Sequence, residues 1–490
     1  MNKIKYLFGL LLTASLCACN GWLDVKPKTQ MEREEYYNTE DGFRSSLVGC
    51  YMKLKNRSLY GEQLTMSGVE FMAQFWQASS QEQTSLTNFD YETTVTESKL
   101  KEWYLQLYKV IAQANDLLDY LDKKGDVIES AERRDLIRGE ALAIRAFCHF
   151  DILRLFGQLP ENATITRRLP YQEKADNKPV AFYDFEAFGQ RVLKDFADAA
   201  NLLKKSDPVT LYSFEALNDP TTAIEKGYIK DDFDAFRRVR FNYWAVKGLQ
   251  ARTYLYLADK TNAYTCAMEV INGQIAGKPV AELSCIDDYG AGLYVTPGEV
   301  LTGLNIPTIS DYIPGLFRND GASLLYRTTD DNTILRDLFA GQSSDTRFLN
   351  LWTGIQGNNA KYYTIKKYWQ SSTGVNNDNN NAVELDMDRQ MVPLIRLAEV
   401  YLIAAESASN VTESNRLFRI FKTSRNLEYN DLTEKQLKNE ILNEYRRELY
   451  AEGQMFFTYK RTGAKYMLWR SAEITEENYV LPLPKSEIEY

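Results

Sequence analysis

Hydrophobic residues recur at three- and four-residue steps in several long segments, which is the spacing of one face of an α-helix. Over 139–157 two such stripes lie side by side and leave little polar surface. We therefore predict a helix there that neighbours cover on more than one side. Residues 243–276 predict two further helices separated by a break at 259–262, together the length of a tetratricopeptide unit, with small Ala251 and Ala263 where two helices would cross.

A third helix pair is predicted from Leu394 to about Asn426, and one more helix from Glu434 to about Glu452. At least three helix pairs favour a mostly α fold, an α-solenoid of tetratricopeptide-like helix pairs. We expect residues 40–490 to form a single domain.

Two loop-rich segments, at about 61–98 and 281–392, interrupt the helical pattern. The second is rich in Gly, Pro, Asn and Asp and has only short β-like stretches, such as 362–365. A long irregular segment inside a compact protein commonly has a binding or lid role. We expect the loop-rich, partly β insertion to form the ligand-binding part.

The first residues have the pattern of an export signal. Lys3 and Lys5 precede an apolar run over 6–16, which is too short to span a membrane. The run ends in Leu-Cys-Ala-Cys, the form of a bacterial lipobox, so we predict a signal peptide over 1–18, acylation of Cys19 and a tether over 19–39. A plain secretory signal is the alternative. The membrane contact would be made through the N-terminal lipid.

Composition and charge exclude several classes of function. The 490 residues are 44% hydrophobic and 26% charged, which is ordinary for a globular chain. The formal net charge is -9 and no Lys/Arg-rich block occurs, so we expect no nucleic-acid partner. With one histidine, His149, the chain cannot form a polyhistidine metal site, and we predict no metal and no cofactor.

Few residues suggest catalysis. Glu440, Glu444 and Glu448 could form a carboxylate cluster for acid/base chemistry, but Arg447 favours a solvated ion-pair face of a helix. His149 lies between phenylalanines and is expected to be a core imidazole. We therefore predict that the protein is not an enzyme; the last alternative is a glycoside hydrolase. The four cysteines after Cys19 are expected to be buried thiols, although Cys266 and Cys285 are close enough in sequence for a local disulfide.

Five segments in a fixed order carry a resemblance to a known family: Trp22–Pro27, Ile144–Pro160, Pro393–Leu402, Asn443–Gly453 and Leu481–Ile488. Together they resemble the SusD/RagB-like outer-membrane lipoproteins of Bacteroidetes over almost the whole chain. The segments are scaffold motifs and do not identify a ligand. Tyr445 and Tyr450 depart from the family's pattern, at positions that we expect to serve packing.

The resemblance implies a lipid-anchored protein of the outer membrane that faces the cell exterior. Such a protein lies as a lid on a TonB-dependent β-barrel transporter of the SusC type and captures glycan, or in some members peptide, for import. We therefore expect glycan binding and delivery to this transporter. The alternatives are a peptide-binding member of the same uptake system and an envelope scaffold without a small ligand.

Aromatic side chains in the loop-rich segments are the candidates for ligand contact, because flat rings stack on the apolar faces of sugars while polar neighbours bind the hydroxyls. The candidate rings are Trp76, Tyr289, Tyr294, Tyr312, Trp352 and Trp369. The candidate polar partners are Asn88, Arg318 and Asp320. A buried aromatic anchor of a loop would have the same pattern in sequence.

Overall fold

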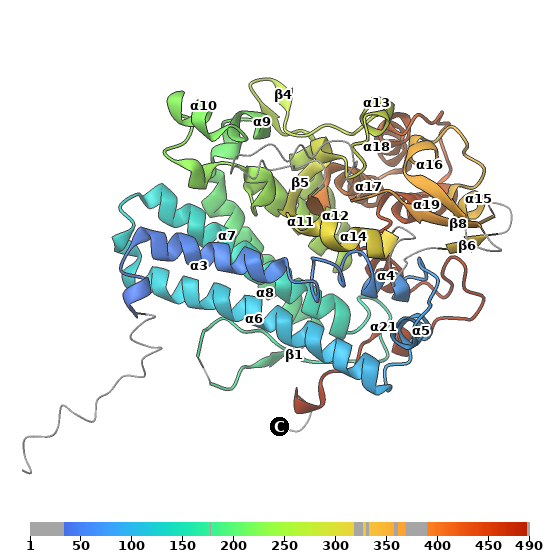
Figure 1. Cartoon of the computed structure of the whole chain (residues 1–490), viewed down its shortest axis with the longest axis horizontal. Coiled ribbons are helices and arrows are strands. Elements are labelled where there is room, and N and C mark those ends of the chain that lie inside the picture. Colours follow the sequence, from blue (N-terminus) through green and yellow to red (C-terminus); the bar gives the residue numbers. More distant parts are fainter. Residues whose placement is uncertain are drawn as a thin grey trace, which may run out of the picture.

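The computed structural model describes residues 34–176, 178–317, 327–329, 333–356, 361–368 and 390–487. Helices dominate this part of the chain, and the strands form only small sheets (Figure 1). The long helices are α3 (Glu40–Leu54), α6 (Thr94–Lys124), α7 (Ala131–Phe156), α8 (Phe185–Ser206), α11 (Tyr243–Tyr256), α12 (Lys260–Ile271), α17 (Leu397–Ser407), α18 (Val411–Ser424) and α19 (Glu434–Glu448). The predicted mostly α fold is confirmed.

The long helices stack as pairs in chain order. Helix α3 packs on α6, α7 on α8, α11 on α12 and α17 on α18. Successive pairs also contact each other, since α6 packs on α7, α8 on α11 and α12 on α17. This continuous row is the arrangement of helix pairs expected from the sequence.

Helix α7 forms the centre of the row, as its two apolar stripes predict. From Gly139 to Phe156 every residue except Leu142 is buried. Its approach to α8 depends on a missing side chain, because a Cβ at Gly139 would lie 2.8 Å from Cγ of buried Leu203. Ala251 and Ala263 in the next pair are fully buried, consistent with their predicted place at a helix crossing.

Strand β9 (Met391–Arg396) corrects one predicted boundary. Residues 394–396 were expected to begin a helix, but they pair antiparallel with β5 (Val300–Asn305), and α17 begins at Leu397. Every residue of β9 is buried. A short, fully apolar run does not distinguish a buried strand from the first turn of a buried helix. The strand fastens the loop-rich insertion to the helical row.

The two loop-rich segments contain more short elements than the sequence predicts. The helices are α4 (Gly68–Met72), α5 (Gln81–Asn88), α13 (Ile286–Gly290), α14 (Ile309–Phe317), α15 (Thr333–Phe339) and α16 (Thr346–Asn350). The strands β6 (Arg327–Thr329), β7 (Trp352–Gln356) and β8 (Lys361–Ile365) form one antiparallel sheet in the order β6-β8-β7.

The remaining elements are short. They are α9 (Phe214–Leu217), α10 (Pro220–Glu225), α20 (Met455–Arg461), α21 (Glu476–Tyr479) and the two-residue strands β1 (Leu169–Pro170), β2 (Phe182–Tyr183), β3 (Gln274–Ile275) and β4 (Lys278–Pro279). Cys50, Cys148, Cys266 and Cys285 are free thiols, and Cys285 is exposed, in contrast to the burial expected of it. Within the described residues, none of the helices is both long and apolar enough to cross a membrane.

Candidate functional site

Two of the predicted rings, Trp76 and Trp352, meet at a residue to which the sequence assigned only packing. Both contact the Tyr450 ring edge-on, with centroid distances of 5.0 Å for Trp76 and 4.8 Å for Trp352. Phe75 stacks on Tyr450 at 4.1 Å, and Phe317 at the end of α14 lies 5.5 Å from Trp76. We call these five rings the Tyr450 cluster. It joins both loop-rich segments to the end of α19.

Tyr312 extends this cluster towards the surface. Its helix, α14, also carries Phe317, and its hydroxyl donates a hydrogen bond of 2.7 Å to the carbonyl oxygen of Gly61. The Arg57 guanidinium lies over the Tyr312 ring, 4.5 Å from its centroid. Glu62 holds Arg57 through a hydrogen bond of 2.7 Å from Nε. The half-buried ring is thus fixed at both its edge and one face.

Tyr294 is the second half-buried candidate. Lys366 donates a 3.0 Å hydrogen bond to its hydroxyl and lies 4.4 Å from its ring centroid. Asn88, the last residue of α5, is exposed. A ligand could reach these side chains without a rearrangement of the core.

Trp76, Tyr289 and Trp352 are buried, with 1%, 2% and 7% of their surface exposed. The Trp76 indole N–H donates to the carbonyl oxygen of Met66. This burial agrees with the reading of these rings as loop anchors rather than as stacking surfaces. Four other predicted residues, Cys19, Arg318, Asp320 and Trp369, lie outside the described residues.

A buried ionic network attaches the second loop-rich segment to α19, the helix that precedes Tyr450. Arg347 follows Asp345 at the start of α16 and reaches both Glu444 (2.7 Å) and Glu448 (2.9 Å) on α19. Arg396 at the end of β9 contacts Glu448 at 2.8 Å. Further members are Glu299, Lys367, Arg425 and Glu452. We call these side chains the anchoring network.

The network corrects the prediction of a solvated ion-pair face. Glu444 and Glu448 are fully buried, and only Glu440 is partly exposed. Burial acts to raise the pKa of Glu448, but Arg425, Arg396 and Arg347 together hold that pKa well below its usual value. The ion pairs were predicted, but their partners come from elements far away in sequence, and local spacing cannot reveal them. The carboxylates are neutralised and serve structure.

Lys367 and Tyr368 complete the attachment by binding the backbone after α19. The Lys367 ammonium donates to the carbonyl oxygens of Glu448 and Tyr450, each at 3.0 Å. The Tyr368 hydroxyl donates to Ala451 at 2.9 Å. The helix ends at Glu448 and not at about Glu452 as predicted, and these bonds satisfy carbonyl oxygens that lack helical partners beyond its end.

Glu70 on α4 binds the same turn from the other side. Its carboxylate accepts hydrogen bonds of 2.9 Å from the backbone N–H groups of Ala451 and Gly453. Burial raises the pKa of Glu70 to about 8, despite these two bonds. The turn after α19 is therefore the point at which both loop-rich segments converge.

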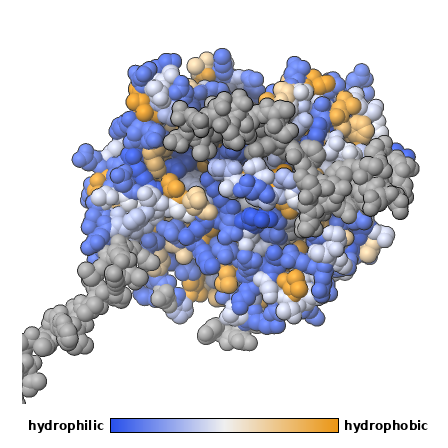
Figure 2. All heavy atoms as spheres, viewed as in Figure 1, coloured by the Kyte–Doolittle hydropathy of each residue, from blue (hydrophilic) through white to orange (hydrophobic). Residues whose placement is uncertain are grey.

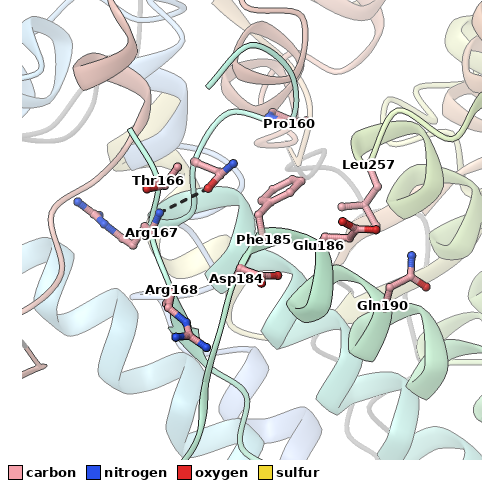
Figure 3. A pocket seen from close by; sticks show the side chains of 10 residues that line it. Pro160, Thr166, Arg167, Arg168, Asp184, Phe185, Glu186, Gln190 and Leu257 are labelled. Atoms are coloured by element: carbon pink, nitrogen blue, oxygen red, sulfur yellow. Dashed lines mark hydrogen bonds between the residues drawn. The ribbon is translucent and has the colours of Figure 1, made fainter. Parts of the chain in front are cut away.

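The structure also contains a cavity that no predicted residue lines. It has a volume of about 660 Å³ and lies at the N-terminal end of α8 (Figure 3). Arg167 and Arg168 lie on one side, and Leu257 and Gln190 on the other. Phe185 is its single aromatic lining residue, so the cavity lacks the several rings that distinguish the Tyr450 cluster.

His149 has the role expected of a core imidazole. Its Nε2 accepts a hydrogen bond from the backbone N–H of Gln172, and its ring stacks on Tyr171 at 3.8 Å. Burial, followed by the nearby Arg145, lowers its pKa well below the usual value. In the part of the chain that the structure describes, no three His, Cys, Asp or Glu side chains form a group suited to a metal ion.

Tyr450 and Arg57 are the main site residues that the sequence did not identify. The sequence shows that Tyr450 departs from the family's pattern, but the rings that it contacts are far away in the chain. Arg57 lies before the loop-rich segment, and only the fold brings it to Tyr312.

Two family models match the chain. One, described as starch-binding and associating with the outer membrane, matches residues 21–255, and the other, the SusD family, matches residues 349–485. Two SusD-like proteins of Formosa agariphila, P25 and P2, are 30% and 22% identical over 167 and 163 residues. These alignments cover 32% and 33% of this chain, and 31% of each relative's own length.

Solved structures of similar fold cover much more of the chain. A laminarin-binding SusD-like protein has a TM-score of 0.65 and 19% identity, with 92% of this chain and 97% of its own chain covered. A SusD superfamily protein from Bacteroides thetaiotaomicron has a TM-score of 0.65 and 19% identity over 92% and 98% of the two chains. Two family models that match residues 21–255 and 349–485, together with a fold shared over 92% of the chain, lead to one conclusion: this protein belongs to the SusD/RagB family.

Proposed function

We propose that this protein is a lipid-anchored binding protein of the outer membrane that captures oligo- or polysaccharide and delivers it to a TonB-dependent β-barrel transporter of the SusC type. Family membership supports the glycan class, because one matching model is described as starch-binding and a structural neighbour binds laminarin.

The observation that carries the proposal is the held Tyr312 ring. A rigid, half-buried aromatic side chain can stack on a sugar without losing conformational freedom, because Gly61 and Arg57 already fix it. The Arg57 side chain is 58% exposed, and both its Nε and its Nη2 contact the Glu62 carboxylate, so Nη1 is left to bind sugar hydroxyls.

The other predicted residues that the structure describes divide by their exposure, and Tyr294 and Asn88 would contact ligand. Arg318, Asp320 and Trp369, outside the described residues, stay predicted ligand contacts. The buried rings Trp76, Tyr289 and Trp352 would instead hold the loops in place. Binding would occur without turnover.

In delivery, the N-terminal lipid and the helix pairs would have different roles. Acylation at Cys19 would keep the protein at the outer membrane, facing the exterior, and the helix pairs would dock on the barrel. The anchoring network would hold the glycan-binding face in a fixed position relative to this docking surface. A ligand bound at Tyr312 would then lie at a constant place above the transporter.

The test of binding is affinity electrophoresis and calorimetry of the acylated full chain in detergent with starch, laminarin and a mixed-peptide pool. We expect saturable binding to one glycan, and Tyr312→Ala to weaken it at least about tenfold, the size of one aromatic contact. Tyr466→Ala is the matched control, because Tyr466 is 60% exposed and outside the Tyr450 cluster.

Each alternative has its own result in this experiment. Binding only to peptides would show that the ligand is a peptide, and hydrolysis of a bound glycan would show that the protein is an enzyme. If no ligand of the panel bound and an envelope protein co-purified, the result would support the alternative of an envelope scaffold. For delivery, Cys19→Ala should abolish lipid labelling, and the wild-type protein should co-purify with a β-barrel.

A further inference from the structure

A second concave region lies around a stacked pair of tyrosines, Tyr212 and Tyr228. Their ring centroids are 4.1 Å apart and their planes differ by 20°. Tyr212 precedes α9, and Tyr228 follows α10. In Figure 1 these two helices lie at the top of the molecule, well separated from α4 and α5, which carry the residues around Trp76.

The tyrosine pair forms a wall between two hollows. One has a volume of about 370 Å³ and the other about 620 Å³, and Leu211, Tyr212 and Tyr228 line both. Each volume lies within the range of about 300–1,000 Å³ that small-molecule sites occupy. Leu211 is 69% exposed, so the top of this wall is open to solvent.

The smaller hollow has a polar group in its lining that lacks a partner. Asp234 is 8% exposed, and its Oδ2 accepts from Arg133 at 2.8 Å. Its other oxygen, Oδ1, is buried and accepts no hydrogen bond from any described residue. A buried acceptor without a donor is unfavourable, because nothing compensates for its loss of hydration. A ligand hydroxyl could donate to Oδ1 only after the Asp234 carboxylate turned towards the hollow, and it would then supply the missing hydrogen bond.

Donors surround the same hollow. Lys205 and Lys230 line it, and Lys230 donates to Ser130 at 3.3 Å. Lys226 lies 5.8 Å from the Tyr228 ring centroid. A ligand here thus meets aromatic rings as a wall, an acceptor in the lining and ammonium donors near the opening.

We propose that the hollow between Tyr228 and Asp234 is a second saccharide-binding site. A sugar combines an apolar C–H face, which packs on an aromatic ring, with hydroxyls that both donate and accept hydrogen bonds. The ring wall, Asp234 Oδ1 and the lysines match these three properties. The site goes beyond the proposed function, because it shares no residue with the Tyr312 face and its binding is measured separately.

The experiment titrates the acylated full chain in detergent, by calorimetry, with hexasaccharides of the α-glucan, β-glucan, β-mannan and arabinan types. Two variants change the site in different ways. Tyr228→Ala removes one ring of the wall, and Leu211→Trp fills both hollows from an exposed position without touching the core. Tyr466→Ala and Tyr312→Ala serve as the surface control and the control for the other face.

We expect one binding step, with at least one hexasaccharide, that Tyr228→Ala and Leu211→Trp each weaken about tenfold or more. The same step should be unchanged in Tyr312→Ala and Tyr466→Ala. Wild-type affinities in both site variants, or the absence of a Tyr228-dependent step throughout the panel, would overturn the second site. Loss of binding in Tyr312→Ala alone would leave the proposed function intact, so the two failures are distinguishable.

Discussion

The Phe75 and Tyr450 rings lie parallel, with their centroids 4.1 Å and their planes 1° apart, although the residues are 375 positions apart in the chain. The Tyr450 hydroxyl also donates to the Phe75 carbonyl oxygen. Because Trp76 and Trp352 contact the edge of the same ring, Tyr450 fixes both loop-rich segments at once.

Tyr450→Ala should therefore destabilise the protein strongly. Removing a fully buried aromatic side chain lowers the free energy of unfolding by about 3–5 kcal/mol, because neighbouring rings cannot close the cavity. Urea unfolding measures this loss. Tyr466→Ala, at a 60% exposed ring, should stay within about 0.5 kcal/mol of the wild type. Equal stabilities of the two variants would contradict the central role of Tyr450.

The helical row could be predicted from the sequence because it depends on local spacing. The stripes in α7 and the alanines in α11 and α12 report packing within and between neighbouring helices. Strand β9 could not be predicted in the same way, because its partner β5 lies far away in the chain. The β9 segment is an apolar run that could equally begin a buried helix, and only its pairing with β5 distinguishes the two structures.

The candidate site was predicted in part. Placing Trp76 and Trp352 in the loop-rich segments was enough to find two rings of one cluster, but it could not distinguish buried anchors from exposed stacking rings. Exposure depends on what covers a ring, as the contrast between Trp76 and Tyr312 shows. Asp234 and the tyrosine pair gave no signal, because no single one of these residues is unusual in sequence.

Glu448→Gln should also destabilise the protein, through the anchoring network. The change keeps the volume but removes the charge that compensates three buried guanidinium groups, Arg347, Arg396 and Arg425. Breaking a buried ion pair in this way lowers the free energy of unfolding by about 3–5 kcal/mol. Urea unfolding at neutral pH measures it, with the exposed Glu428→Gln as a control that should have no effect.

The same variant should change the response to acid. The pKa of Glu448 lies well below its ordinary value of 4.5 in the folded protein, so its carboxylate stabilises the fold above about pH 4.5. That contribution is lost as the pH falls towards the folded pKa. As the pH falls below about 5, the wild type should therefore lose stability more steeply than Glu448→Gln. Parallel acid profiles would show that Glu448 is not held ionised by its arginines.

Glu70 predicts the opposite dependence on pH. Because burial raises its pKa to about 8, the folded state keeps a proton that the unfolded state releases near pH 4.5. Stability from this group is full below about pH 4.5 and is lost as the pH rises to about 8. Glu70→Gln should be less stable than the wild type near pH 5, because its amide nitrogen cannot accept one of the two backbone N–H groups, and should gain stability relative to the wild type as the pH rises, by up to about 1.4 kcal/mol per pH unit.

Thermal unfolding between pH 5 and 9 checks this relative gain, and Glu92→Gln, at an exposed carboxylate, should follow the wild type throughout. If Glu70→Gln were less stable than the wild type by the same amount at every pH, the Glu70 carboxylate would be ionised in the folded state and would serve only as an acceptor for Ala451 and Gly453.

Two glycines in helices test the close approach of α7 and α8. A Cβ at Gly139 would lie 2.8 Å from Cγ of fully buried Leu203, whereas a Cβ at Gly49 in α3 would meet only the Gln113 side chain at 4.0 Å. Both substitutions to alanine gain helix propensity, about 1 kcal/mol each. Gly139→Ala also overpacks the contact, which costs about 1–3 kcal/mol. Urea unfolding should therefore find Gly139→Ala less stable than Gly49→Ala by about 1–3 kcal/mol, and equal stabilities would mean that α7 and α8 can separate without loss.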